Sequence, residues 1–289
     1  MKEYRMTTRR KLAIATWSSP KEGNIYGKMT IDATNLLRYC QEMTEKTGEK
    51  ITVTHVVGKI VGMGLKEAPD INGRIAYGKY IPHKTADLAF LIAIPKAHDL
   101  GKFKVCEIDK KSVVEIAQEL KAAANKLRSG EDNEFKKSQD VVKILPTWIL
   151  RPILWLTGYI TGALGLGIKP LGLEAYPFGS AIITSVGMFG IDEGYPPPTP
   201  FARVPLYIVI TKIKERPVVH QNEVVIRPQL DLMLTIDHRF IDGFRGGQLS
   251  KLLKHYLENP YRMDELSASS PSQTIAASPD IPVEPQVHA

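Results

Sequence analysis

The sequence predicts an α+β fold, because strand patterns and helix patterns follow one another in mixed order. Along residues 230–236, Leu and Ile alternate with Asp, Met and Thr, a period of two that is typical of a strand with one apolar face. From Phe244 the apolar spacing becomes helical, and Pro260 closes the stripe. Elements in such an order indicate layers of sheet and helix.

Composition bounds the class of protein before any motif is considered. The 289 residues are 43% hydrophobic, enough for a large core in one domain or two. The net charge of +7 is spread along the chain without clustered basic and aromatic runs, which favours a small polyanion over nucleic acid as partner. Cys40 and Cys106 are too few for a disulfide framework or a zinc site. With a charged start and no signal peptide, these features predict a cytoplasmic protein.

The first part of the chain predicts a strand followed by two helices. Residues 25–31 alternate as a strand does, and Asp32 or Thr34 is expected to cap a helix that ends at Gly48. Thr54 is expected to cap a second helix, which a proline ends.

A buried strand and a third helix are expected next. Residues 87–94 form a nearly continuous apolar run of strand length, which indicates a strand buried on both faces. Ser112 and Glu115 have the spacing of a capping box, and Gly130 follows the helix that they begin.

A segment at residues 133–177 begins polar and becomes almost wholly apolar over residues 144–168. The favoured interpretation is a helical hairpin that packs on the protein's own core or on a neighbouring subunit, with Trp148 and Trp155 against neighbouring helices. The alternative is an interfacial segment, or a lid over a long acyl chain, in contact with lipid or acyl groups. A simple transmembrane anchor is disfavoured, because the uncharged run after Pro152 is shorter than the roughly 20 residues that span a bilayer.

The strand at 230–236 leads into the run DHRFIDG, residues 237–243. A histidine is thereby delivered at the end of a strand, with a carboxylate four residues later in a turn that Gly243 allows to bend. Taken alone, His238 is better explained as a histidine that caps a strand end than as a catalytic base. A metal site made of Asp237, His238 and Asp242 is a weaker interpretation, because no further histidine motif supplies ligands at a suitable spacing.

This run resembles the DHRxxDG motif of the catalytic domain of 2-oxoacid dehydrogenase acyltransferases and the HxxxDG of chloramphenicol acetyltransferases. A second block, IITSVGMFG at 182–190, is similar to the family's FTISNLGMFG. A third, KITV at 50–53 followed by LKEAPDIN at 65–72, is similar to KISV and ALKEVPEVN. The resemblance implies a chloramphenicol acetyltransferase-like α+β fold, with a mixed sheet and flanking helices. Its extent implies a catalytic domain over residues 1–263 with the apolar insertion at 133–177, while the polar composition of residues 264–289 predicts a disordered tail.

The resemblance implies acyl transfer between coenzyme A, or an acyl-coenzyme A, and a thiol, hydroxyl or amine acceptor. Such a reaction needs a base, the role implied for His238, and a donor to the tetrahedral oxyanion, implied for Thr184 in place of the family's serine. Asp242 is implied to hold the active-site loop by an ion pair, with Arg239 or Arg10 as partner. No metal is expected to take part.

The family further implies a homotrimer or a larger cage, with each active site where subunits meet. After Ile94 the family's TPDGLIVPVI is replaced by PKAHDLGKF, and no lipoyl attachment motif is found in the chain. The alternative is therefore a noncatalytic structural or membrane-associated homologue that forms an oligomeric scaffold, with lipid contact through residues 144–168.

Overall fold

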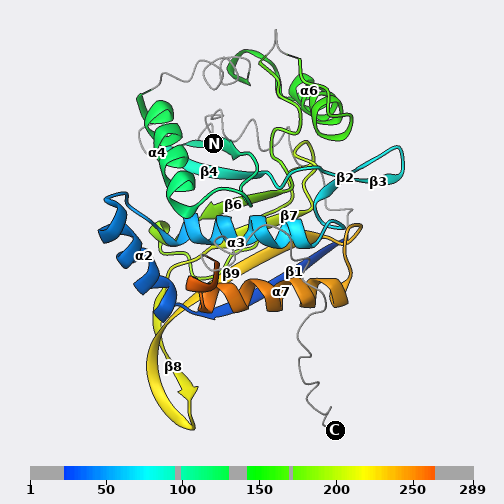
Figure 1. The fold of residues 1–289 in the computed structure, drawn as a ribbon. Helices are drawn as coiled ribbons and strands as arrows, with labels where there is room; N and C mark the ends of the chain where they lie inside the picture. Colours follow the sequence, from blue (N-terminus) through cyan, green and yellow to red (C-terminus); the bar gives the residue numbers. More distant parts are fainter. Residues whose placement is uncertain (1–22, 95–98, 130–141, 169–171, 264–289) are drawn as a thin grey trace, which may run out of the picture.

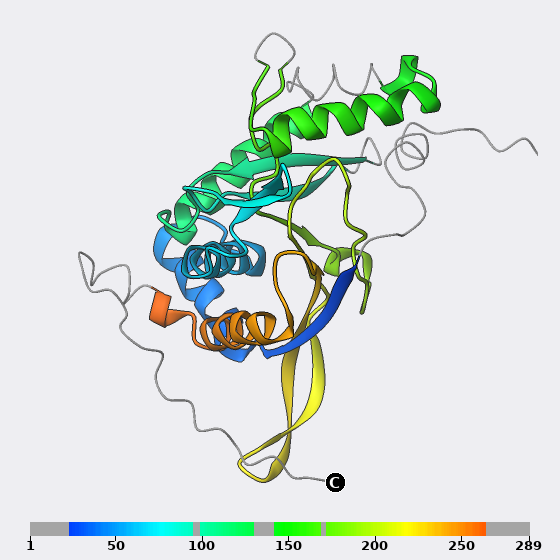
Figure 2. The same ribbon diagram turned by 90° about the vertical axis from the view of Figure 1, so that its right-hand side faces the viewer.

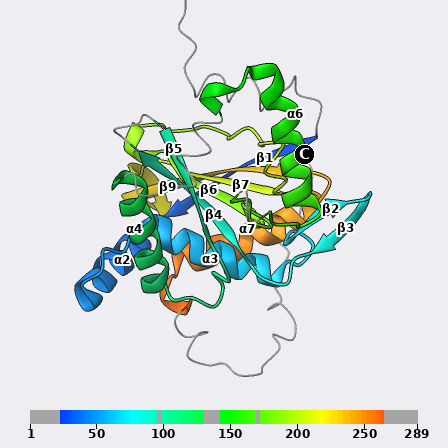
Figure 3. The same cartoon turned by 90° about the horizontal axis from the view of Figure 1, so that it is seen from above.

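The computed structural model describes residues 23–94, 99–129, 142–168 and 172–263. Its centre is a seven-stranded mixed sheet in the order β1-β9-β7-β6-β4-β5, with β8 paired to β9. Helices α2, α3, α4 and α7 lie against one face of this sheet (Figure 1, Figure 3). The predicted α+β fold with a mixed sheet and flanking helices is therefore confirmed. Arg10 and the tail at 264–289 lie outside the described residues.

The described elements have the following bounds. The strands are β1 (Asn24–Asp32), β2 (Gly73–Ala76), β3 (Lys79–Pro82), β4 (Leu88–Ile94), β5 (Asp99–Val105), β6 (Ala181–Ser185), β7 (Leu206–Ile210), β8 (Lys214–His220) and β9 (Glu223–Asp237). The helices are α2 (Thr34–Thr47), α3 (Val53–Glu67), α4 (Val113–Ser129), α6 (Thr147–Gly158) and α7 (Gly243–Glu258), with shorter turns at Tyr159–Ala163 and Gly187–Phe189. Strand β6 runs parallel to both of its neighbours, β4 and β7, whereas β9 is antiparallel to β1, β7 and β8.

Local signals at the first two helices act only in part as predicted. The expected cap of α2 at Asp32 or Thr34 is wrong, because the N-cap is Ala33, which makes no side-chain cap hydrogen bond. The Asp32 carboxylate accepts the backbone N–H of Thr34 at 3.0 Å, and Gly48 ends α2 in the left-handed region at φ 70°. The expected cap of α3 at Thr54 is wrong, because the N-cap is Thr52. The backbone N–H of Thr52 donates to Nδ1 of His55 at 3.2 Å, so a histidine completes the first turn.

Strand β4 and helix α4 are also confirmed. Strand β4 has a partner on each side, β5 and β6, and its first three residues are buried. At the start of α4 the Ser112 hydroxyl accepts the backbone N–H of Glu115 at 3.2 Å. The Glu115 carboxylate accepts the backbone N–H of Ser112 at 2.7 Å, which completes the predicted capping box.

Strand β9 departs from the expectation of a single apolar face. Its leucines pack on the helices as predicted, but Asp231, Met233 and Thr235 on the opposite face are also fully buried. Alternation shows that two faces differ, and it does not show that the more polar face meets water. The burial of a carboxylate in the middle of this strand requires compensating partners.

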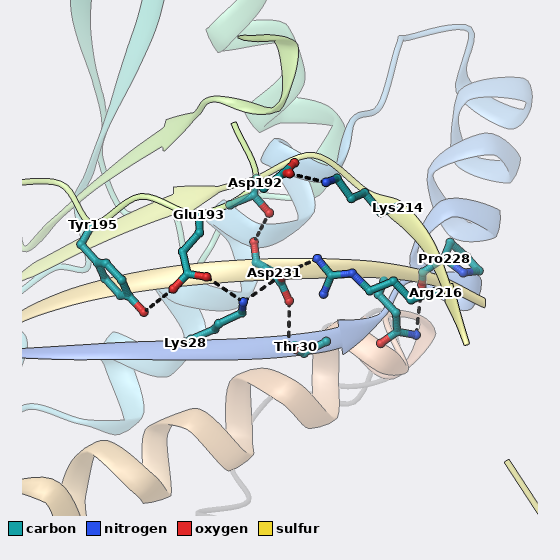
Figure 4. Close-up of polar contacts among 11 residues, drawn as sticks. Lys28, Thr30, Asp192, Glu193, Tyr195, Lys214, Arg216, Pro228 and Asp231 are labelled. Carbon is teal, nitrogen blue, oxygen red and sulfur yellow. Dashed lines mark hydrogen bonds and ion pairs between the residues drawn. The ribbon is translucent and has the colours of Figure 1, made fainter. Parts of the chain in front are cut away.

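Those partners come from the two strands beside Asp231 (Figure 4). The Thr30 hydroxyl donates to Oδ1 of Asp231 at 2.8 Å, and Nη2 of Arg216 donates to Oδ2 at 2.8 Å. Nζ of Lys28 lies 3.5 Å from the same carboxylate and 3.1 Å from Glu193. Burial alone would raise the pKa of Asp231, but the contacts with Arg216 and Thr30 outweigh it and lower this pKa below 3.8. The cluster joins β1, β8 and β9.

In the described part of the apolar insertion, residues 142–144 are helical and helix α6 follows after Pro146. The expected hairpin stays a prediction, because residues 133–141 and 169–171 lie outside the described residues. Helix α6 includes Pro152 and continues directly into the π-helical turn Tyr159–Ala163. Its side chains Trp148 and Trp155 are 76% and 58% exposed, so they do not pack on neighbouring helices of this chain as expected. The Trp155 ring stacks instead on Tyr159, with centroids 5.7 Å apart. Figure 2 shows α6 at one end of the molecule and the β8–β9 hairpin at the other.

Two glycines explain where this helix docks. A Cβ on Gly158 would lie 2.5 Å from the carbonyl oxygen of Phe201, and one on Gly162 would lie 3.4 Å from Cδ of Arg203. These two glycines therefore allow a close contact between the helical segment and the 201–203 loop. Among the residues that the structure describes, no helix has both the length and the apolar character needed to cross a lipid bilayer.

We predict that Asp231→Ala lowers the free energy of unfolding by about 1.5–3 kcal/mol, the usual contribution of hydrogen bonds to a buried charged group. Because the folded pKa of Asp231 lies below 3.8, its contribution is present above that pH and is lost as the pH falls through the folded pKa. Urea unfolding at pH 7 and at pH 3 measures both effects. The control is Asp192→Ala, which removes the exposed ion pair with Lys214 and should change stability by under about 1 kcal/mol. Equal losses in the two variants would contradict the role of burial.

Candidate functional site

The DHR turn, residues 237–243, follows β9 directly and connects it to α7. Asp237 is the last residue of the strand, and the backbone N–H of His238 donates to the carbonyl of Gly23 at 3.2 Å. The His238 side chain is exposed. The strand therefore delivers a histidine to the surface on a backbone that is hydrogen-bonded to the residue preceding β1.

The start of the turn is fixed by an ion pair between Asp237 and Arg239. Arg239 donates from Nε to both carboxylate oxygens of Asp237, at 2.9 and 3.0 Å, and from Nη2 at 2.5 Å. The backbone N–H of Phe240 donates to the carbonyl of Asp237 at 3.0 Å, which closes the turn. Arg239, one of the two partners expected for Asp242, thus binds Asp237 through several hydrogen bonds.

The end of the turn is fixed by a helix cap. Oδ1 of Asp242 accepts the backbone N–H of Arg245 at 3.0 Å, as the N-cap of α7. Nε of Arg245 in turn donates to Asp70 at 2.7 Å, which ties α7 to the connection between α3 and β2. Arg10, the other expected partner of Asp242, lies outside the described residues. The ion pair that holds the loop stays a prediction.

Arg245 and Asp70 are residues that sequence reasoning missed. Asp70 stands in the block LKEAPDIN, and Arg245 stands two residues after the DHR turn. Both positions lay within or beside matched motifs, but 175 residues separate them in the chain. No local pattern connects an ion pair over such a distance.

Thr184 lies on β6 and pairs with Leu91 on one side and Val209 on the other. Val209 pairs in turn with Met233, four residues before Asp237. From strand spacing of about 4.8 Å and a rise of about 3.4 Å per residue, the Cα atoms of Thr184 and Asp237 are roughly 16 Å apart. One chain therefore does not bring Thr184 and the DHR turn within hydrogen-bonding reach.

A cavity of about 210 Å³ lies beside the DHR turn. Asp237, Arg239 and Phe240 line it, together with Arg203 and with Trp155 of α6. A larger cavity of about 330 Å³ is lined by Arg74 and His83 among others and contains no residue of the turn. Within the described ranges, no cluster of three or more His, Cys, Asp or Glu side chains is placed to hold a metal ion.

The family model for the 2-oxoacid dehydrogenases acyltransferase (catalytic domain) matches residues 1–139 and 171–264. The chain belongs to this family. The match includes the DHR turn and Thr184, and it leaves out residues 140–170, which contain α6.

Relatives in sequence are acyltransferase components of multienzyme complexes. The probable dihydrolipoyllysine-residue succinyltransferase component of the 2-oxoglutarate dehydrogenase complex of Schizosaccharomyces pombe is 28% identical over 232 residues, 78% of this chain and 41% of that protein. The corresponding component of Saccharomyces cerevisiae is 26% identical over 227 residues, 78% of this chain and 39% of that protein. The chain thus spans about two fifths of the length of these relatives.

Solved structures agree on the fold. A probable dihydrolipoamide acetyltransferase from Listeria monocytogenes aligns with a TM-score of 0.65 at 22% identity, over 89% of this chain and 94% of that one. The cubic core of a pyruvate dehydrogenase multienzyme complex aligns with a TM-score of 0.63 at 22% identity, over 91% of this chain and 93% of that one. The family's α+β fold is thereby confirmed for this chain.

We predict that Asp242→Ala lowers the free energy of unfolding by about 0.5–2 kcal/mol, because α7 loses its N-cap. Asp242→Asn should retain most of this stability, since asparagine caps helices about as well as aspartate. Thermal or urea unfolding of the two variants measures the difference. If Asp242→Asn is as stable as the wild type and yet loses activity, the charge itself holds the loop, as an ion pair requires. Equal destabilisation by both substitutions would contradict the capping role.

Proposed function

We propose that this chain is an acyltransferase that moves an acyl group between coenzyme A and a thiol, hydroxyl or amine acceptor. The observation that carries the proposal is the exposed His238 on a turn fixed at both ends, within the part of the chain that matches the acyltransferase family. A dihydrolipoyl thiol is the acceptor to test first, because the relatives are named for transfer to or from that group.

In the proposed reaction, His238 removes the proton of the attacking thiol as its sulfur bonds to the thioester carbonyl carbon. The tetrahedral intermediate places negative charge on the former carbonyl oxygen, and the hydroxyl of Thr184 donates a hydrogen bond to it. The bond from carbon to the sulfur of coenzyme A then breaks, and His238 returns the proton to the departing thiolate. No metal is needed for these steps.

The separation of Thr184 from the DHR turn supports a site shared between subunits. Two side chains that start roughly 16 Å apart cannot contact the same reacting carbon directly. We therefore propose a homotrimer in which His238 of one subunit faces Thr184 of the next. A larger cage built from such trimers is the further step, and one fold neighbour is named as a cubic core.

The exposed apolar side chains of α6 and the residues just before it support a contact beyond the single chain. Ile144 is 79% exposed and Leu156 is 52% exposed, and burying such side chains is worth roughly 1.5–3 kcal/mol each. Of the two interpretations, a neighbouring subunit is our proposal, and lipid is the alternative outcome. Flotation of the protein with liposomes would favour lipid, whereas weaker self-association of Leu156→Ser in sedimentation would favour the subunit contact. We also propose a cytoplasmic location, because a contact between α6 and a neighbouring subunit does not require a membrane.

We predict that His238→Ala lowers kcat for acyl transfer by at least about 10², the range of general-base catalysis. The assay follows free thiol released from acetyl-coenzyme A in the presence of dihydrolipoamide. His255→Ala is the matched control, because His255 is exposed near the end of α7, far along the chain from the turn. Unchanged turnover in a folded His238→Ala variant would remove this residue from the mechanism.

A second prediction tests the shared site. His238→Ala and Thr184→Ala subunits should each be inactive alone, and mixing them under conditions that allow subunit exchange should restore part of the activity. Restoration occurs because some mixed interfaces combine an intact His238 with an intact Thr184. A monomer in sedimentation that is still active would refute the arrangement.

A further inference from the structure

We propose that α6 of one subunit packs on the β8–β9 hairpin of a second copy of this chain, and that this contact helps to close the proposed trimer. The inference rests on the proposed function, because it names the surfaces that bring the two halves of the shared site together. Both surfaces are apolar and exposed, and they lie at opposite ends of the molecule (Figure 1, Figure 2). One is a helix and the other is a face of a sheet.

The first surface is an apolar stripe on one face of the β8–β9 hairpin. Val219 pairs with Val224, and Pro217 pairs with Ile226, so these four side chains lie on the same face. Val219, Val224 and Ile226 are 76%, 75% and 73% exposed. We call these four residues the hairpin stripe.

The hairpin stripe continues the face of β9 that helices cover elsewhere. Alternate residues of a strand share a face, so Val224 and Ile226 are on the same side as Leu230 and Leu232. These two leucines belong to the core between sheet and helices, whereas the stripe is exposed. An apolar sheet face is stabilised when a helix lies on it. Within the described residues no helix buries the stripe, so a helix from another copy would complete the layer.

The second surface is the exposed side of α6. Trp148 and Trp155 are seven residues apart, about two turns of a helix, so they point to the same side. Both rings are largely exposed, as are Leu156 beside them and Ile144 just before the helix. A helix with such a side lacks a sheet to lie on, and the hairpin stripe lacks a helix.

The two surfaces follow the two halves of the proposed shared site. Trp155 lines a cavity with Asp237, so α6 lies at the end of the sheet that carries the DHR turn. Thr184 lies in the row of Met233, and the hairpin follows further along β9 in the direction away from the turn (Figure 1). When His238 of one subunit faces Thr184 of the next, α6 of the first is therefore on the side from which the hairpin of the second projects.

The dimensions of the two projections are compatible with this contact. Ile226 precedes Met233 by seven residues, which places the nearer end of the hairpin stripe roughly 24 Å from the row of Thr184. Helix α6 has 12 residues and is about 18 Å long. It therefore extends over most of that distance from the cavity beside the DHR turn.

The charges of the two surfaces favour contact with each other over contact with themselves. Lys143 and Arg151 are the charged residues among 142–168, and both are cations. On the hairpin face that carries the stripe the charged residue is Glu215, an anion, while the arginines of the hairpin lie on the other face in ion pairs. Contact of α6 with a second α6 would place like charges together. A contact between two different surfaces also repeats around a ring, as a closed trimer requires.

The first experiment introduces a charge into either surface. Trp148→Asp and Val224→Asp should each weaken self-association in sedimentation at least about tenfold, because the core of an interface does not accommodate an unpaired charge. Tyr77→Asp is the matched control, since Tyr77 is 75% exposed at the tip of the β2–β3 hairpin, outside both surfaces, and should associate like the wild type. Circular dichroism checks that each variant is folded. Equal association in all four proteins, or an equal loss in the control, would overturn the contact.

The second experiment identifies the two surfaces directly by cross-linking. Cys106 is exposed and is first replaced in a Cys106→Ser background. Subunits with Trp148→Cys are then mixed with subunits with Val224→Cys, and a short bismaleimide is added. Linked pairs of chains should form in the mixture, and Tyr77→Cys in place of Val224→Cys should give none. A mixed trimer without linked chains would overturn the contact.

Failure of this contact is distinguishable from failure of the proposed function. If both Asp variants stay trimeric while mixed His238→Ala and Thr184→Ala subunits regain activity, the shared site stands and the contact fails. If the chain associates through both surfaces but turns over no thioester, the acyltransferase proposal fails and the contact stands. If Trp148→Asp stays trimeric and instead loses flotation with phosphatidylglycerol liposomes, α6 meets lipid and the contact is overturned.

Discussion

The pairing of β9 with three other strands is the constraint on which the rest of this structure depends. Its fifteen residues pair with β1 along one edge and with β7 and β8 along the other, and both faces are buried from Leu230 to Ile236. A strand enclosed in this way has little freedom to slip, because a shift of one residue would exchange its two faces. Asp231 reinforces this register, since its carboxylate has partners on β1 and β8 at one point only. The position of the DHR turn follows from the end of this strand.

Both ends of the turn are anchored, and the histidine between the anchors is exposed. The Asp237–Arg239 pair fixes the start, while Asp242 and Arg245 connect the end to α7 and to Asp70. Anchored backbone around an exposed imidazole lowers the entropy that must be lost when a substrate is positioned. Thr184 is positioned differently. It lies on β6, in the parallel part of the sheet, and β7 separates it from β9. The proposed trimer accounts for both positions, because it pairs His238 of one subunit with Thr184 of the next.

Helix α6 shows how a new segment can be added without disturbing the sheet. It docks through glycines onto the 201–203 loop and leaves most of its large apolar side chains exposed. The central strands keep the order and pairing described above, because α6 contributes no strand. An addition of this kind changes the wall of a cavity and the outer surface. The geometry of the DHR turn is determined by β9 and α7, which it connects.

The sequence by itself determined the elements whose signals are local. The alternation of β1, the glycine at the end of α2 and the capping box of α4 each involve neighbouring residues, and each acts in the structure as its pattern predicts. The DHR motif likewise placed His238 at a strand end. The remaining strands were not predicted. Among them β2, β3, β5 and β8 are short and their mixed side chains carry no clear period, so that pairing with a neighbouring strand decides their conformation. Only the tertiary structure decided that Asp231 is buried, that Arg245 meets Asp70, and that Trp155 reaches the cavity beside the turn. Each depends on residues brought together by sheet pairing or helix docking across long stretches of chain, and such contacts leave no periodic trace in the sequence.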